Sequence, residues 1–140
     1  MCIGWDEIGD LSLIKSLNEC KDELKDAQNK PDSSFMNDGL ALWEFSHMMK
    51  LEDVVYAKQG ANTIIARGIV KSEYAYDDTQ EDFYHTRKVE WTHIGAWTLE
   101  KNIVQKTLTD ITKDHDYVKK IESMLDTLLV LQHILIMKNQ

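Results

Sequence analysis

A run of sixteen residues, ALWEFSHMMKLEDVVY at positions 41–56, constrains the fold more than any other segment of this chain. It predicts a short helix that carries Trp43, with Leu40 and His47 on the same helical face, followed directly by a β-strand. The next segment, NTIIARGIVKSEYAY at positions 62–76, predicts a second strand and a turn rich in tyrosine. This order of elements suits a small barrel with an aromatic pocket at its rim. The two segments therefore favour a binding protein over an enzyme.

The length and composition are those of one soluble globular domain, residues 1–140. Of the 140 residues, 43% are hydrophobic and 29% are charged. The longest apolar run, residues 128–137, is interrupted by Gln132 and His133 and is shorter than the ~20 residues that span a bilayer. The N-terminal residues have no signal-peptide pattern. We therefore expect a cytoplasmic protein that makes no membrane contact.

The acidic charge is concentrated in the first part of the chain. The formal net charge is -8, and residues 1–55 carry 12 acids and 5 bases, whereas residues 56–113 carry 8 of each. Because phosphate neutralisation supplies most non-specific affinity for nucleic acids, an acidic chain is a poor general polyanion binder. Any nucleic-acid contact must therefore be local, and His85 lies among the basic residues that could make it. The phosphate contacts that we expect are Lys58, Arg67, Lys71, Arg87 and Lys88.

Two helices are predicted before the first strand. Residues 18–29 form an exposed helix, with Ser16 as its N-cap and Glu19 completing a capping box. The helix that carries the tryptophan follows, and either Asn37 or Asp38 can cap it.

Residues 53–58 and 63–71 are rich in β-branched side chains and predict two strands joined by a hairpin turn at residues 59–62. Gly68, inside the second strand, indicates a bulge or a close backbone approach. A further strand is predicted at residues 84–92, and one or two more at residues 97–108.

The last segment, residues 116–138, has the period of a closing C-terminal helix, which either Asp114 or Asp116 can cap. One apolar stripe runs along it, formed by Val118, Ile121, Leu125, Leu128, Leu129 and Gln132. Helices, then a mostly antiparallel sheet, then a closing helix predict the α+β class.

Five stretches carry a resemblance to a known family: GWDEIGDLS, NDGLALWEFSHMMKLEDVVYAK, IIARGIVKSEYAYDD, RKVEWTHIGAW and KTLTDITK. Over residues 3–120 the chain resembles the EVE-type, PUA-like domain at the N-terminus of some McrB-like modification-dependent restriction ATPases, which is related in fold to the YTH readers. The resemblance implies a small β-barrel flanked by helices. It also implies base flipping, in which a modified DNA base such as N6-methyladenine or a modified cytosine enters an aromatic cage. In such systems an AAA+ motor and a nuclease are the partners that act on the marked DNA.

The chain departs from this family pattern at both ends. The family pattern places a hydrophobic first strand before the GWDE segment, which leaves open whether this strand is missing here and whether the pocket is functional. The phosphate-binding motif G-x-x-x-x-G-K-[ST] is absent from the sequence, so nucleotide hydrolysis is not expected.

The resemblance assigns the base-binding cage to aromatic residues. Trp43 matches the tryptophan after the first helix of the family, and Tyr74 and Tyr76 are candidates for the second face. Trp5 could close the pocket, and Asp10 could accept a hydrogen bond from an exocyclic amine. Each residue has a simpler alternative: a tryptophan in the core, a tyrosine that covers the sheet, and a solvated carboxylate.

Patterns for catalysis or metal binding are missing from the sequence. It contains neither HExxH nor G-x-S-x-G, and the five histidines are scattered, which is typical of surface or capping positions. Cys2 and Cys20 have no ligand spacing and are expected to be reduced, incidental thiols. We therefore predict no catalytic residue, no metal and no cofactor.

Two other functions are compatible with the sequence. A PUA-like domain could instead read RNA through its 2′-hydroxyl groups. Alternatively, the chain could be an interaction domain or a homodimer that uses its C-terminal helix, because the apolar stripe continues into Ile134, Leu135 and Met137.

Overall fold

The computed structural model describes residues 1–125 and 134–138, and the chain divides into two compact units. Unit 1 consists of Met1–Met49 and Ser72–Lys88, and unit 2 consists of Lys50–Lys71 and Val89–Gln140. Each unit contains one mostly antiparallel sheet and at least one helix, which confirms the α+β class. The two units do not test whether residues 1–140 form a single domain, which stays a prediction.

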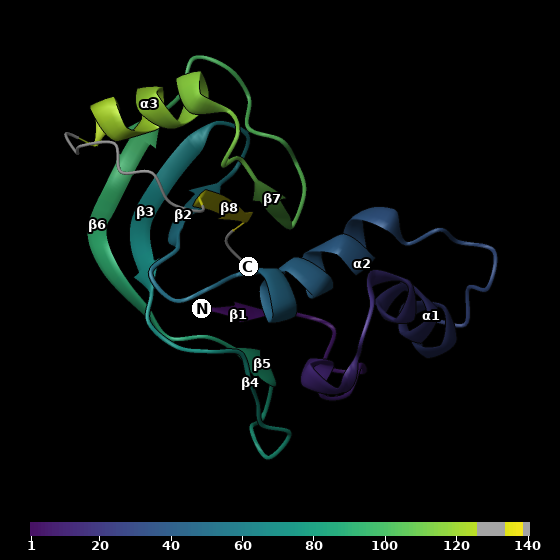
Figure 1. Ribbon diagram of the computed structural model, residues 1–140. Helices are drawn as coiled ribbons and strands as arrows, with labels where there is room; N and C mark the ends of the chain where they lie inside the picture. Colours follow the sequence, from purple (N-terminus) through teal and green to yellow (C-terminus); the bar gives the residue numbers. More distant parts are fainter. Residues whose placement is uncertain (126–133, 139–140) are drawn as a thin grey trace. The chain divides into compact units, whose positions relative to one another are not determined.

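Unit 1 combines helices with three very short strands (Figure 1). In chain order its elements are β1 (Cys2–Ile3), the 3-10 helix η1 (Leu11–Leu13), α1 (Leu17–Ala27), α2 (Met36–Trp43), the π-helix η2 (Glu44–Met48), β4 (Ala75–Tyr76) and β5 (His85–Thr86). The strands pair antiparallel in the order β1-β5-β4. A sheet this small provides few ladder hydrogen bonds, so side-chain contacts must stabilise unit 1.

Helix α1 begins where the sequence predicts. Ser16 Oγ accepts a hydrogen bond from the Glu19 N–H at 3.1 Å, which confirms the N-cap. The Glu19 carboxylate accepts from the N–H of Lys15 at 2.8 Å rather than from that of Ser16, so the capping box is displaced by one residue. The helix buries Leu24 and the free thiol of Cys20. Burial is the main cause that raises the pKa of Cys20 to about 11.

Helix α2 starts earlier than predicted, and neither Asn37 nor Asp38 caps it. The residue before the helix is Phe35, at φ 46°, and Asp38 lies in the first turn. Phe35 is buried, and burying an aromatic side chain outweighs the ~1 kcal/mol of a polar cap. Helix α1 also approaches closely at Gly39, where a Cβ atom would lie 2.8 Å from Cγ of Lys21. Packing therefore decides where α2 begins.

The strand predicted at residues 84–92 is wrong in extent, because the structure contains two strands there. β5 ends at Thr86 in unit 1, and β6 begins at Val89 in unit 2. Arg87 lies between them and exchanges two backbone hydrogen bonds with Met1, of 2.9 and 3.0 Å. These bonds fix the backbone of Arg87 inside unit 1.

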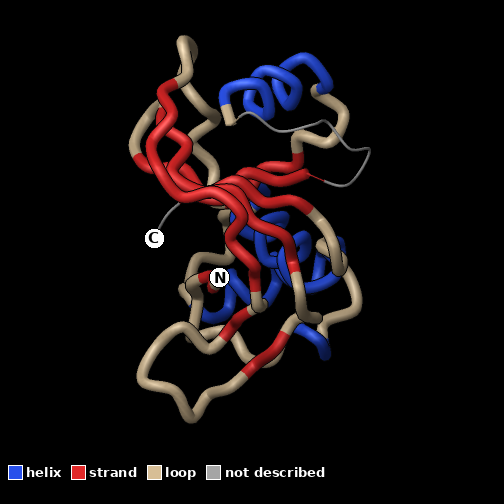
Figure 2. The backbone as a smooth tube through the Cα atoms, turned by 90° about the vertical axis from the view of Figure 1, so that its left-hand side faces the viewer, coloured by secondary structure: helices blue, strands red, loops and turns tan. Residues whose placement is uncertain are grey.

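In its described residues, unit 2 is a five-stranded sheet covered by one helix (Figure 1). Its elements are β2 (Val54–Gln59), β3 (Thr63–Val70), β6 (Val89–Thr98), β7 (Leu108–Asp110), α3 (His115–Met124) and β8 (Ile134–Lys138). The strand order is β6-β3-β2-β8-β7; β2 pairs with β8 in parallel, and the other neighbours among these five strands pair antiparallel. Figure 2 shows these strands running side by side with a marked twist.

The β2–β3 hairpin confirms the most regular part of the sequence pattern. The strands pair antiparallel around a turn in which Gly60 has φ 68°. The bulge predicted at Gly68 is also present, because the register with β6 shifts between Arg67 and Gly68. A Cβ atom at Gly68 would lie 2.4 Å from Cγ1 of Val89 and 2.8 Å from Cε3 of Trp91. Glycine is therefore required by the close approach of β6.

The prediction of a C-terminal helix over residues 116–138 is wrong in its extent. Helix α3 ends at Met124, and β8 occupies the last part of the predicted helix as a central strand of the sheet. Asp114 is the N-cap, and its carboxylate accepts from the Tyr117 N–H at 3.3 Å. Leu128, Leu129 and Gln132 of the predicted stripe lie outside the described residues. An apolar run as short as ILIM carries no period of its own, and here a buried parallel neighbour makes it a strand.

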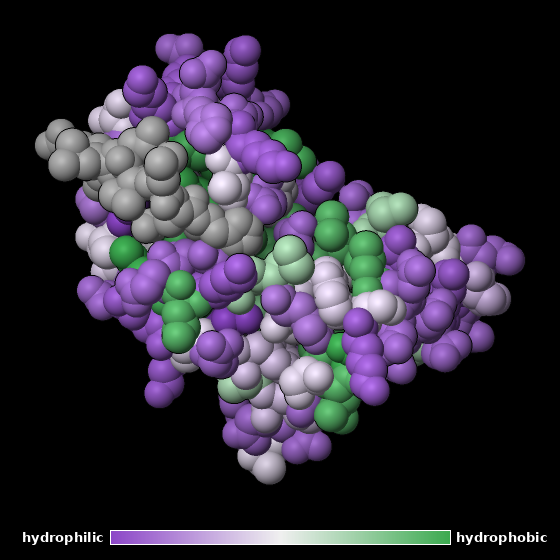
Figure 3. All heavy atoms as spheres, in the orientation of Figure 1, coloured by the Kyte–Doolittle hydropathy of each residue, from purple (hydrophilic) through white to green (hydrophobic). Residues whose placement is uncertain are grey.

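The core of unit 2 lies between α3 and one face of the sheet. Val118, Ile121 and Leu125 of the helix side pack with Tyr56 and other apolar residues of the strands. The surface over α3 is hydrophilic (Figure 3), as expected for an amphipathic helix.

Within the described residues the sheet of unit 2 is open, with β6 and β7 as its edge strands. A closed barrel is therefore not seen in this part of the chain. None of the helices in the described ranges is long and apolar enough to span a membrane.

Candidate nucleic-acid interface

The five residues predicted to form the cage all lie in unit 1, but they belong to separate clusters. Trp43 is the last residue of α2 and is partly exposed. Its ring stacks on that of His47, with 4.0 Å between centroids and 12° between planes. His47 lies in the π-helix η2, and π-helical turns occur frequently at functional sites. The predicted common face of Trp43 and His47 is therefore confirmed.

Ser46 holds the imidazole of His47 in this position. The Ser46 hydroxyl donates to the carbonyl of Leu42 at 2.7 Å and lies 2.7 Å from Nδ1 of His47. Because the hydroxyl has a single proton, Nδ1 must carry a proton and donate to Oγ. Ser46 therefore holds the orientation of the His47 ring on which Trp43 stacks.

Tyr74, predicted as a cage wall, instead belongs to a buried hydrogen-bond chain. His85 is fully buried, and its Nε2 lies 3.1 Å from the carbonyl of Trp5, which can only accept. Nδ1 of His85 lies 2.7 Å from the Tyr74 hydroxyl, and the same hydroxyl accepts from the Leu11 N–H at 3.0 Å. Burial is the main cause that raises the pKa of Tyr74 to about 12. The chain is fully satisfied, which indicates a structural role.

We expect Tyr74→Phe to lower the free energy of unfolding by about 1–3 kcal/mol, because it leaves the Leu11 N–H and Nδ1 of His85 without their shared partner. Urea unfolding followed by far-UV circular dichroism measures the change. Tyr76→Phe is the matched control, since the Tyr76 hydroxyl makes no hydrogen bond within the described residues. Equal losses in the two variants would contradict the structural role of Tyr74.

Tyr76 is the predicted cage residue with the most open surroundings. It is partly exposed, and its ring lies 5.3 Å from His85 and 6.3 Å from Tyr84 between centroids. The segment that carries Tyr84 is held by Asp6, whose carboxylate accepts from the N–H groups of Phe83 and Tyr84, both at 2.9 Å. Asp6 therefore orders this loop.

Trp5 and Asp10 also have local roles. Trp5 is partly exposed, has φ 66° and supplies its carbonyl to His85. Oδ1 of Asp10 accepts from both the N–H and the hydroxyl of Ser12, at 2.9 and 2.7 Å, and so caps η1. No ring contact among the described residues joins Trp5 or Trp43 to Tyr74 or Tyr76. The predicted set is thus a stacked pair and a tyrosine cluster rather than one cage.

Three of the five predicted phosphate contacts are wrong, because their side chains are buried. Lys58 is 0% exposed and donates to Gln105 at 3.2 Å. Arg67 is 8% exposed and pairs with Glu122 at 3.1 Å. Arg87 is 3% exposed. A phosphate contact requires an accessible cation, so these three residues stabilise the protein instead.

The other two cations are exposed. Lys71 pairs with the Glu52 carboxylate at 2.8 Å, and both side chains are open to solvent. The Lys88 side chain makes no hydrogen bond or ion pair in the part of the chain that the structure describes. Both can reach a phosphate group.

The sequence places His47 on the face of Trp43 but gives it no role, and it offers His85 as a local nucleic-acid contact, which is wrong because His85 is fully buried. His47 could have been found from its spacing, four residues after Trp43 on a predicted helix. The structural role of His85 gave no local signal, because its partners are 80 and 11 residues away in the sequence.

A family model described as a domain of unknown function, DUF8426, matches residues 1–112. The chain belongs to this family. No curated protein and no solved structure matches the chain. The DUF8426 match includes all of unit 1 and four strands of unit 2, and it ends before α3.

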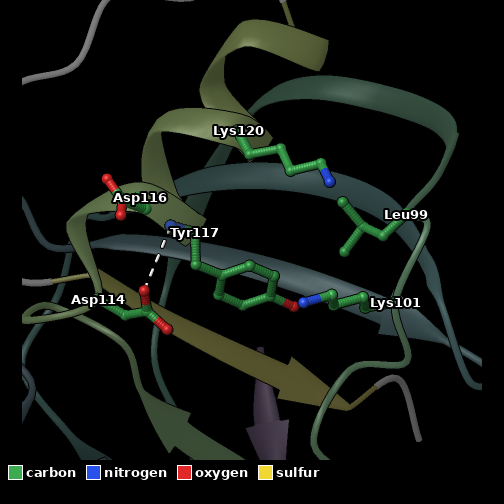
Figure 4. Close-up of a pocket in the computed structure, with 6 residues that line it drawn as sticks. All are labelled: Leu99, Lys101, Asp114, Asp116, Tyr117 and Lys120. Atoms are coloured by element: carbon green, nitrogen blue, oxygen red, sulfur yellow. Dashed lines mark hydrogen bonds between the residues drawn. The ribbon is translucent and has the colours of Figure 1, made fainter.

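The α3 segment, beyond the DUF8426 match, contributes to a cavity in unit 2 that sequence reasoning missed (Figure 4). Its volume is about 300 Å³, and it is lined by Leu99, Lys101, Asp114, Asp116, Tyr117 and Lys120. Burial, followed by the charge of Asp114, raises the pKa of Tyr117, so the phenol keeps its proton at neutral pH.

Proposed function

We propose that this protein is a nucleic-acid-binding module that stacks one modified base on Trp43. The observation that carries this proposal is the partly exposed indole of Trp43, which His47 supports from one side at 4.0 Å. A rigid aromatic face stabilises a stacked base by about 1–3 kcal/mol. A base swung out of its duplex would stack on the indole face that the histidine does not cover.

The proposal includes the kinship with EVE-type, PUA-like domains. The α+β class is compatible with it, as is a tryptophan at the end of the helix that precedes the first long hairpin. The proposal also includes the cytoplasmic localisation that the sequence predicts. An AAA+ motor and a nuclease would then be separate subunits that act on the DNA to which this module binds.

The preference for a modified base is expected to be modest. Burial of one methyl group contributes about 0.8 kcal/mol, and a hydrophobic pocket discriminates one methylene by about 1–3 kcal/mol. Weaker pairing of a modified base lowers the cost of flipping and adds to the preference.

The salt dependence should also be small. Lys88 is the accessible phosphate contact in the unit that carries Trp43, so log K should fall with log salt at a slope of about -1. Affinity would then decrease only about threefold between about 50 and 200 mM salt.

Trp43→Ala is expected to weaken binding of adenine-methylated or cytosine-modified oligonucleotides about tenfold, since it removes the stacking surface. Fluorescence anisotropy with labelled duplexes measures the affinity, and unmodified duplexes of the same sequence give the preference.

Trp91→Ala is the matched control, because Trp91 is 40% exposed but lies on β6 of unit 2. If Trp43→Ala binds every oligonucleotide as the parent protein does, the stacking proposal is wrong. Tighter binding of RNA strands than of DNA strands of the same sequence would favour the RNA reader over the DNA reader.

The homodimer through a C-terminal helix loses its structural basis. Ile134, Leu135 and Met137, which suggested an exposed apolar stripe, are buried in β8. They stabilise the sheet and cannot form the proposed interface.

A further inference from the structure

The cavity in unit 2 brings together a buried hydroxyl without a hydrogen-bond acceptor and the ammonium group of an exposed lysine. The Tyr117 hydroxyl is buried and has no hydrogen-bond partner within the described ranges. The ammonium group of Lys101 also makes no hydrogen bond or ion pair with any described residue. Both side chains line the cavity, and Figure 4 shows the Tyr117 phenol pointing toward Lys101. A buried hydroxyl without a partner is unfavourable, so an oxygen that accepts from both groups would be bound favourably.

The cavity has chemically different ends (Figure 4). Lys101 and Lys120 lie on the side of Leu99, and Asp114 and Asp116 lie on the opposite side. The ring of Tyr117 lies between them and offers a flat apolar surface. A complementary ligand has an anionic group at one end, a planar middle, and hydroxyl or amino donors at the other end.

We propose that this cavity binds a nucleoside monophosphate. The phosphate accepts hydrogen bonds from Lys101 and from the Tyr117 hydroxyl, and the base lies against the Tyr117 ring and Leu99. Asp116 accepts from an amino or ribose hydroxyl group. The volume of about 300 Å³ is at the lower limit of the small-molecule sites found in proteins. This site lies in unit 2 and is independent of the stacking surface in unit 1.

Two of the side chains that line the cavity, Lys120 and Asp114, already interact with other residues. The ligand must compete with these interactions. Lys120 pairs with Glu100 at 3.3 Å, and this pair is largely exposed. Such a pair contributes little, so a phosphate can compete for the ammonium group. Asp114 caps α3 and remains with the helix. Lys101 is therefore the main cation for the phosphate.

Isothermal titration of the full chain with AMP and with CMP tests the proposal. We expect saturable binding with a dissociation constant below 1 mM, and at least tenfold weaker binding of adenosine and of inorganic phosphate taken separately. Lys101→Ala should weaken AMP binding about tenfold and leave the weak adenosine binding unchanged. Tyr117→Phe should weaken AMP binding several-fold, and circular dichroism confirms that each variant is folded.

Lys119→Ala is the control for lysine removal, since Lys119 is exposed on α3 but does not line the cavity. Trp43→Ala should leave AMP binding unchanged, and Lys101→Ala should leave the binding of 5′-hydroxyl oligonucleotides unchanged, so the two sites are tested separately. Tighter binding of 5′-phosphorylated than of 5′-hydroxyl oligonucleotides, lost in Lys101→Ala, would identify a strand end as the source of the phosphate. No binding of AMP or CMP at 5 mM, or equal binding by Lys101→Ala, would overturn the proposal.

Discussion

Glu122→Ala is expected to lower the free energy of unfolding of unit 2 by about 3–5 kcal/mol. Glu122 lies on α3 and is 3% exposed. Its carboxylate accepts from Nε of Arg67 at 3.1 Å and from the hydroxyl of Tyr56. Removal of the carboxylate leaves the Arg67 cation buried without its counter-charge, and breaking one side of a buried ion pair costs far more than the pair contributes.

The same network ties the helix to the sheet. Arg67 is on β3 and also donates to Thr92 of β6 at 3.1 Å, while Tyr56 is on β2. Burial, with the hydrogen bond and the charge of Glu122, raises the pKa of Tyr56, so the phenol remains a donor to the carboxylate at every ordinary pH. Glu122 of α3 therefore contacts β2 and β3 directly and β6 through Arg67.

Urea unfolding of the parent and variant proteins measures the loss. Glu100→Ala is the matched control, because the Glu100–Lys120 pair is largely exposed and should contribute less than about 1 kcal/mol. The double variant Arg67→Met, Glu122→Leu removes both charges and should recover much of the loss. A loss in Glu122→Ala no larger than in Glu100→Ala would show that the network does not stabilise the sheet.

The parts of the fold that the sequence predicts well depend on neighbours in the chain. The hairpin of β2 and β3 follows from β-branched runs around a short turn, and the N-cap of α1 follows from Ser16 and Glu19 three residues apart. The Gly68 bulge follows from a glycine within a strand pattern. For the turn and the N-cap the interacting groups lie within a few residues, and for the bulge the glycine itself is the signal, although its partner Trp91 lies on β6.

The parts that were missed depend on residues far apart in the chain. β8 pairs in parallel with β2, about 80 residues earlier, and nothing in an apolar run of four residues indicates this partner. Arg67 is separated by 55 residues from Glu122, so its burial could not be read from its own segment. A lysine or arginine is expected at the protein surface. That expectation fails where a carboxylate or carbonyl oxygen from a distant part of the chain accepts its hydrogen bonds in the interior.

In the candidate site, too, the contacts between residues close in sequence were predictable and those between distant residues were not. The stacking of Trp43 on His47 was predictable as a helical spacing of four residues. The role of Tyr74 was not, because its hydroxyl is shared by Leu11 and His85, which are 63 and 11 residues away. Tyrosine-rich turns attract a binding interpretation, but a buried phenol with two partners is part of the structure.

Arg87→Lys is expected to lower the free energy of unfolding of unit 1 by about 2–4 kcal/mol, although it keeps the charge. The Arg87 guanidinium donates to the carbonyls of Phe45 at 2.7 Å, Ser72 at 3.0 Å and Ser46 at 3.3 Å, and it lies 5.9 Å from the centre of the Phe45 ring. These contacts join the π-helix η2 to the segment before β4. A lysine has no planar fork, so it cannot reach all three carbonyls, and buried carbonyls then lose their partners.

This variant also separates the two roles that Arg87 could have. A phosphate contact depends mainly on charge, so lysine would preserve it, whereas the structural role depends on the geometry of the guanidinium group. Lys88→Ala is the matched control at the next position, since its side chain is exposed and should change stability by less than about 0.5 kcal/mol. Thermal and urea unfolding measure both variants beside oligonucleotide affinity. Parental stability in Arg87→Lys, with weaker oligonucleotide binding in Arg87→Met, would assign Arg87 to the nucleic acid and refute its role as a support for η2.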